Sequence, residues 1–172
     1  MATPKTLLFS AALLLAGLVA CTPEATQALS SGVLSSDAPS VAYVHSYNLP
    51  SHGVALEGYC PVAYFAVNKP VRGKPEHSAL YDDVTYHFVS ADARDAFIAE
   101  PQKYVPAFGG WCAFGMAVED KFPVDPTSFK IVDGQLMVFL KNPGVDARAI
   151  WNDGNEKELK AKAAAHWASV RG

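Results

Sequence analysis

The sequence predicts a single α+β domain of short antiparallel strands with packed helices, placed behind an export signal and a flexible tether. Three observations predict this class. The signals along the chain come in the order of strands, a helix, a hairpin and further helices, which is typical of an α+β domain. Removal of residues 1–20 leaves about 150 residues, enough to bury one sizeable core. No internal repeat is visible, so we expect one folded domain over residues 41–172.

The first 21 residues have the layout of a bacterial secretory signal. Lys5 precedes an apolar run that ends at Leu18-Val-Ala-Cys21. The run has about 13 residues, too few to cross a bilayer, which takes about 20. A cysteine directly after a small residue is the layout of a lipobox, so we expect residues 1–20 to be removed and Cys21 to be lipidated. The alternative is an ordinary signal peptide with a chance cysteine.

The lipid on Cys21 would hold the exported protein on the bacterial membrane. One acyl chain binds only marginally, so stable anchoring takes at least two. Thr22 rather than aspartate follows the cysteine, which favours the outer membrane, facing the periplasm. Residues 21–40 are rich in Ser, Thr, Ala and Pro and contain no aromatic residue, which predicts a flexible linker.

The first elements of the domain are expected to be strands. Pro61–Phe65 is a short apolar run after a glycine-containing turn and could form a buried strand, and residues 68–75 should be a loop. Val84–Val89 is rich in β-branched and aromatic residues, which predicts a strand. The pair Asp82-Asp83 predicts a turn back to residues 79–81.

Helix and hairpin signals follow. Ser90 has the position of an N-cap, with Asp92 in the first turn, so a helix is expected over residues 91–99. In Phe108–Met116 three glycines interleave with aromatic residues, which predicts sharp turns packed by large rings. Asp133-Gly134 between two apolar segments predicts a hairpin. Two helices, near residues 146–151 and 156–170, complete the chain; the second has an apolar stripe of Leu159, Ala163, Trp167 and Val170.

Composition and motifs exclude several functions. The net charge of −3 gives no basic footprint for nucleic acid. The chain has no nucleophile elbow, phosphate loop or dinucleotide fingerprint. Nothing in the sequence therefore demands an enzyme, and we lean towards a protein that is not one.

The residues that could carry chemistry are two cysteines, a methionine and a histidine. If Cys21 carries lipid, Cys60 and Cys112 remain, and in an oxidising compartment they should form a disulfide, bind a metal or act as a redox pair. Each could also be a small buried apolar residue. We expect the two to meet in space. Met116 and His87 could complete a soft site of the kind that suits Cu(I), although Met116 could be core filler and His87 should face away from its strand neighbours, towards solvent.

Six short motifs in order resemble the YHS-domain proteins, in particular their secreted bacterial branch. They are Gly58–Phe65, Tyr86–Ser90, the segment from Phe97 to Pro106, Gly109–Ala113, Val124–Pro126 and Asp133-Gly134. The resemblance covers roughly residues 55–167. It implies a small α+β domain and a role in handling copper or other heavy metals. The metal-associated form of the family has cysteines where this chain has Ala63 and Val89.

These observations favour a lipid-anchored periplasmic module that holds or senses a soft metal such as copper. Cys60 and Cys112 would be the thiolate ligands, with Met116 and His87 completing the shell. Two alternatives stay open. One is a thiol redox protein in which Cys60 attacks and Cys112 resolves. The other is a non-catalytic lipoprotein with a structural disulfide. The partners expected are the membrane, through Cys21, and a metal ion, with no nucleic acid; the sequence names no protein partner.

Overall fold

The computed structural model describes residues 46–50 and 53–171, which all belong to one compact unit of the chain. The expected signal segment and linker, residues 1–40, lie outside the described residues, as does Cys21. Within the described ranges no helix is both long and apolar enough to cross a membrane.

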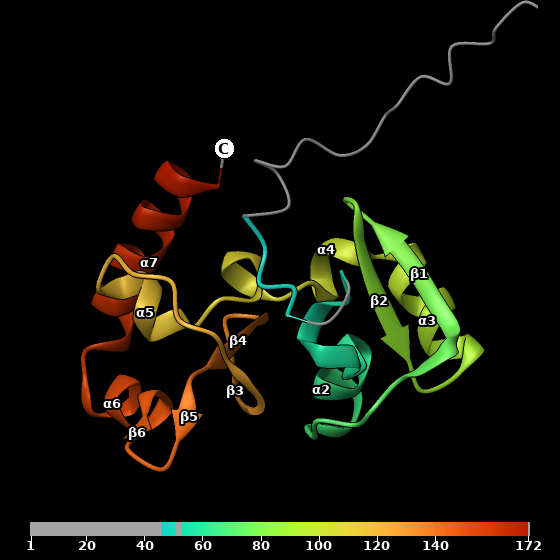
Figure 1. The fold of residues 1–172 in the computed structure, drawn as a ribbon, viewed down its shortest axis with the longest axis horizontal. Coiled ribbons are helices and arrows are strands. Elements are labelled where there is room, and N and C mark those ends of the chain that lie inside the picture. The colour runs from blue at the N-terminus through green and yellow to red at the C-terminus, as the bar shows by residue number, and fades with distance from the viewer. Residues whose placement is uncertain (1–45, 51–52, 172) are drawn as a thin grey trace, which may run out of the picture. The chain divides into compact units, whose positions relative to one another are not determined.

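The described residues combine helices with three small antiparallel sheets, so the α+β prediction holds at this level (Figure 1). The first half contains η1 (Ala55–Gly58), α2 (Pro61–Val67), β1 (Lys74–Tyr81), β2 (Val84–Phe88), α3 (Ala91–Ala99) and α4 (Pro101–Tyr104). The second half contains η2 (Ala107–Gly110), α5 (Ala113–Ala117), β3 (Asp125–Val132), β4 (Gln135–Phe139), β5 (Lys141–Asn142), β6 (Val145–Asp146), α6 (Ala147–Asp153) and α7 (Glu156–Val170).

Both predicted hairpins form, for local reasons. β1 pairs with β2 through the turn Asp82-Asp83, whose φ angles are 56° and 59°. β3 pairs with β4 through Asp133-Gly134, with φ angles of 49° and 73°. Two successive left-handed residues define the tight turn that matches the twist of paired strands, and Asp and Gly are the residues that adopt it most readily.

The predicted helices begin at side-chain caps. The Ser90 hydroxyl accepts a hydrogen bond from the backbone N–H of Ala93 at 3.2 Å and starts α3. Asp146 and Asn155 start α6 and α7 in the same way. These bonds satisfy donors that the first helical turn leaves without partners, which fixes where each helix starts.

The strand expected at Pro61–Phe65 is wrong, because this segment is the helix α2. Pro61 occupies the first helical position, where its missing N–H costs nothing and its fixed φ suits the helix. The helix ends at Asn68, which is left-handed with φ 50°. A proline in a buried strand would instead remove a hydrogen bond from the sheet.

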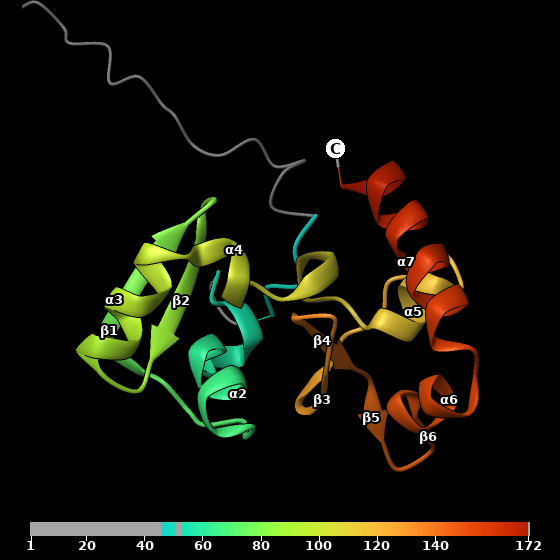
Figure 2. The same cartoon turned by 180° about the vertical axis from the view of Figure 1, so that it is seen from behind.

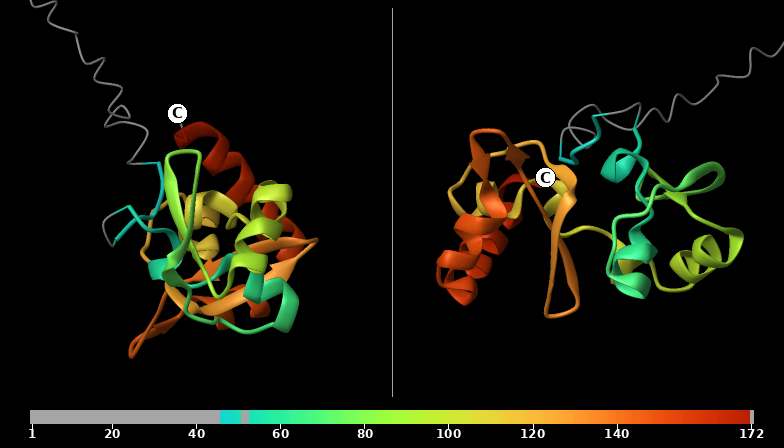
Figure 3. Two further views of the ribbon diagram at one scale, coloured as in Figure 1. Left: turned by 90° about the vertical axis from the view of Figure 1, so that its right-hand side faces the viewer. Right: turned by 90° about the horizontal axis from the view of Figure 1, so that it is seen from below.

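The structure also contains an internal repeat that the sequence did not reveal. Each half runs through a left-handed 3-10 turn, a short helix, a hairpin and a capped helix. The two hairpins share one irregularity, a break in the register of their paired strands. In the first hairpin the break lies between the pairs Lys74↔Phe88 and Ser78↔His87. In the second it lies between Asp125↔Phe139 and Phe129↔Val138, and each of these residues is the same number of positions along the chain from its counterpart in the first hairpin. The two repeats lie side by side, joined by the segment after α4 (Figures 2 and 3).

Strand β4 joins the two repeats because both of its faces are buried. Leu136 and Val138 belong to the core cluster of the first repeat, while Met137 and Phe139 belong to that of the second. All four are fully buried. Successive side chains of a strand point to opposite faces, so the two core clusters lie on opposite faces of β4. Full burial of each such side chain is worth about 1.5–3 kcal/mol, which makes this strand the main link between the repeats.

Tyr64 adds a polar link between the repeats. Its hydroxyl donates to the backbone oxygen of Pro126 at 2.9 Å, and its ring meets Phe129 edge to face, with 4.8 Å between ring centroids. Burial, and secondarily the charge of Tyr59, hold the pKa of the Tyr64 hydroxyl well above its usual range. The group is therefore a neutral donor at any physiological pH.

Candidate functional site

Cys60 and Cys112 occupy the same place in the two repeats. Each follows a 3-10 turn of left-handed residues, with φ 51–84° before Cys60 and 55–79° before Cys112, and each is the N-cap residue of the next helix. The backbone N–H of Cys60 donates to Val71 O at 2.9 Å, and that of Cys112 donates to Phe122 O at 3.1 Å. Both side chains are fully buried, and both thiols are free.

The aromatic residue before each cysteine is covered by a cation. The Arg72 guanidinium lies 4.5 Å from the centre of the Tyr59 ring, and the Lys121 ammonium lies 5.8 Å from that of the Trp111 ring. Such contacts are worth about 0.5–1 kcal/mol at exposed sites. The two repeats thus also share a cation packed on the aromatic residue that precedes the buried cysteine.

Cys60 and Cys112 form no disulfide, since both thiols are free, and they belong to different core clusters. Cys60 belongs to the core cluster of the first repeat and Cys112 to that of the second, so β4 stands between the two clusters. The geometry of Cys112 suggests a local role, because its Sγ accepts a hydrogen bond from the backbone N–H of Gly115 at 3.4 Å. A small apolar side chain with a weak acceptor suits a fully buried N-cap.

Of the other predicted ligands, Met116 lies near Cys112, whereas His87 lies in the other repeat. Met116 is fully buried one turn after Cys112, in the same core cluster. His87 is half-buried on β2, on the face opposite the buried Tyr86 and Phe88, and a methyl group added at Gly58 would lie 3.3 Å from its Nδ1. Among the described residues no group of three or more His, Cys, Asp and Glu side chains could hold a metal ion.

A cleft of about 670 Å³ lies between the two repeats. The turn of the first hairpin, α4, the segment around η2, the start of β4 and the last turns of α7 all contribute to it. This size lies within the range of about 300–1,000 Å³ that is common for small-ligand sites. Sequence reasoning missed the cleft because its walls come from distant segments. Asp82, Phe108 and Trp167 stood out only as parts of a turn, a glycine-rich segment and an apolar stripe.

Tyr47 crosses this cleft and ties its two sides together. Its hydroxyl donates to Asp82 Oδ2 at 3.0 Å, on the turn of the first hairpin. Its ring meets Trp167 of α7 edge to face, with 6.3 Å between centroids. We call residues 46–50 the strap, because Tyr47 in this segment contacts both sides of the cleft.

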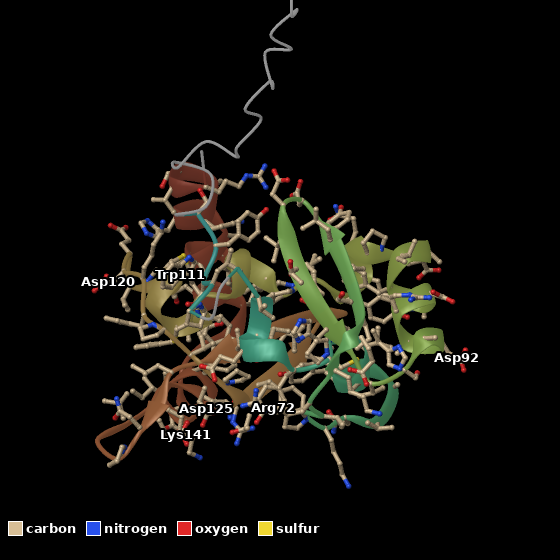
Figure 4. The ribbon with its side chains drawn as sticks, turned by 45° about the vertical axis from the view of Figure 1, so that its right-hand side comes forward. Arg72, Asp92, Trp111, Asp120, Asp125 and Lys141 are labelled. Carbon is tan, nitrogen blue, oxygen red and sulfur yellow. The ribbon has the colours of Figure 1, made fainter. Side chains whose placement is uncertain are left out.

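Hydrogen bonds hold the strap on the second repeat, and one of them runs from the backbone N–H of Asn48 to Gly109 O at 2.9 Å. Asn48 Nδ2 donates to Gly110 O at 3.0 Å, and Ser46 Oγ donates to Arg171 O at 2.9 Å. Trp111 Nε1 donates to Ser46 O at 3.0 Å, and Figure 4 shows Trp111 beside the strap. Asn48 and Ser46 are both buried. The strap is therefore part of the folded unit, and its Tyr47 lines the cleft.

The charges on the cleft wall are largely balanced. Lys160 Nζ forms an ion pair with Asp133 Oδ2 at 2.7 Å. Gln102 Nε2 donates to the Tyr81 hydroxyl. Within the described part of the chain, the side chains of Gln135 and Arg171 have no hydrogen-bond or ion-pair partner. These two side chains are thus available to a ligand.

No protein-family profile matches the chain, and comparisons with curated proteins and with solved structures give no match either.

Proposed function

We propose that this chain is an exported, lipid-anchored binding module of the YHS type, and that its ligand binds in the cleft between the two repeats. The observation that carries the proposal is the cleft itself, of about 670 Å³, with the strap residue Tyr47 tied to both of its sides. The export signal, the lipid on Cys21 and the outer-membrane location rest on Leu18-Val-Ala-Cys21 and Thr22.

The burial of both thiols argues against thiol chemistry. A reactive cysteine needs partial exposure and a positively charged setting that stabilises the thiolate. Cys60 and Cys112 are fully buried in separate apolar clusters. We infer that each serves its own repeat as the residue that turns the chain into a helix.

A fragment screen by NMR on the ¹⁵N-labelled full chain tests the binding site. The proposal expects the fragments that bind to shift the amide signals of residues around the cleft, such as Tyr81, Phe108 and Trp167. Hits that concentrate elsewhere would refute it. Ellman's reagent tests the thiols: both should react only after denaturation, whereas fast reaction of the native protein would favour the redox alternative.

A soft-metal site remains a second candidate, favoured by one observation. Cys112 and Met116 lie one helical turn apart, in the same core cluster, and residues so spaced are neighbours on a helix. Thiolate and thioether sulfur are donors that select Cu(I). A site built on this pair would leave out Cys60, unlike the site expected from the sequence.

A further inference from the structure

Four of the polar side chains around the cleft share one geometry: each ends in a flat group with at least two hydrogen-bonding atoms in a plane. They are the carboxylate of Asp82, the amides of Gln102 and Gln135, and the guanidinium of Arg171. A carboxylate accepts, a guanidinium donates, and an amide does both. Neighbouring hydroxyl groups on a sugar ring have the spacing that such planar pairs recognise, because each hydroxyl can donate and accept.

The apolar part of the wall consists mainly of aromatic rings. Trp167 and Tyr81 are half-buried and come from opposite repeats, and the buried Phe108 also lines the cleft. The face of an aromatic ring is partly negative, so it attracts the weakly positive C–H groups on the flat side of a pyranose ring. Aromatic walls next to planar polar groups therefore suit a ligand that is flat and apolar on its faces and hydroxylated at its edge.

The charge balance argues against an ionic ligand. Lys160 is neutralised by Asp133, and Asp82 and Arg171 have opposite signs. An anion would meet the carboxylate of Asp82 and the carbonyl end of α7, and a cation would meet Arg171. The residues that line the cleft therefore favour neither a negatively nor a positively charged ligand.

We propose that the cleft binds a neutral saccharide, with pyranose rings stacked between the aromatic walls and hydroxyl groups held by Gln135, Arg171 and Asp82. This inference rests on the proposed binding function and names the class of its ligand. β-1,4-Linked sugars with equatorial substituents fit best, because both faces of each ring present C–H groups.

Cellotriose is the probe, titrated into the ¹⁵N-labelled full chain to about 10 mM, ten times the concentration that half-fills a site with a Kd of about 1 mM. The expected result is a saturable shift of the amide signals of residues lining the cleft. Gln135→Ala and Arg171→Ala should each weaken binding about threefold to tenfold, as the loss of one hydrogen bond predicts. Arg94→Ala is the matched control, since Arg94 pairs with Asp95 away from the cleft, and it should leave the affinity unchanged.

Three results would overturn the saccharide proposal. They are the absence of saturable shifts, saturation that maps outside the cleft, and equal affinities for the two cleft variants and the control. 2-Naphthoate, a flat organic anion, provides a comparison: tighter binding of naphthoate than of cellotriose in the cleft would also overturn it. If cellotriose fails while the screened fragments still bind in the cleft, the proposed binding function stands and only the saccharide class is lost.

Discussion

Replacement of Gly109 by alanine tests how the cleft wall is packed. Gly109 is left-handed, with φ 60°, and a methyl group there would lie 2.6 Å from Trp167 Cη2 and 2.9 Å from Ser46 O. Two costs therefore add. A left-handed conformation costs a residue with a side chain about 1–2 kcal/mol, and overpacking costs about 1–3 kcal/mol more. We expect Gly109→Ala to lower the free energy of unfolding by about 2–5 kcal/mol.

Gly134→Ala is the matched control, because it separates the two costs. Gly134 is also left-handed, with φ 73°, but a methyl group there would meet nothing within 4 Å. Only the conformational cost of about 1–2 kcal/mol remains. Urea unfolding followed by circular dichroism measures both variants. Equal losses of stability in the two variants would refute the close packing of Gly109 against Trp167 and the strap. The same packing would be refuted if Trp fluorescence changed in Gly134→Ala but not in Gly109→Ala.

Three further predictions concern the anchor, the repeat contact and the metal candidate. Cys21→Ser should move the protein out of the membrane fraction, and unchanged partitioning would disprove lipidation. Tyr64→Phe should lower the free energy of unfolding by about 1–2 kcal/mol, because it leaves a buried carbonyl unpaired. Burial raises the pKa of Tyr64 in the folded protein above the unfolded value of about 10, so the stability of the wild type should fall as the pH rises above 10. Urea unfolding of the variant should lack that part of the fall. In the soft-metal candidate, Cys112→Ser weakens Cu(I) binding tenfold or more and Cys60→Ser leaves it unchanged, as titration against a competing chelator would show; no binding by the wild type eliminates the candidate.

Local chemistry made the hairpins and capped helices predictable. The Asp133-Gly134 turn and the Ser90 cap depend on residues within a few positions of each other, so their signal is complete in a short window of sequence. The α2 segment was misread because an apolar run of five residues has no period that separates a strand from a buried helix. The deciding signal was Pro61 at its start, which favours the first turn of a helix.

The candidate site depended on contacts that no short window contains. Cys60 and Cys112 look like a pair in sequence because each follows a glycine and an aromatic residue. The structure explains the likeness differently, since the two are equivalent positions of a repeat and each is buried in its own core cluster. The likeness of the two segments therefore indicates the repeat.

The two faces of β4 show why the repeat creates a site that neither half could hold alone. In β2, the alternate residues Thr85 and His87 are only half-buried, whereas their counterparts in β4, Leu136 and Val138, are fully buried against the first repeat. The replacement of polar by apolar side chains at these two positions turns a one-sided hairpin into a shared strand. Once β4 is shared, α7 of the second repeat faces the first hairpin across a gap that no core residue fills, and the strap lies along it. The cleft is thus a consequence of how the repeats join, which is why its residues are scattered through the sequence.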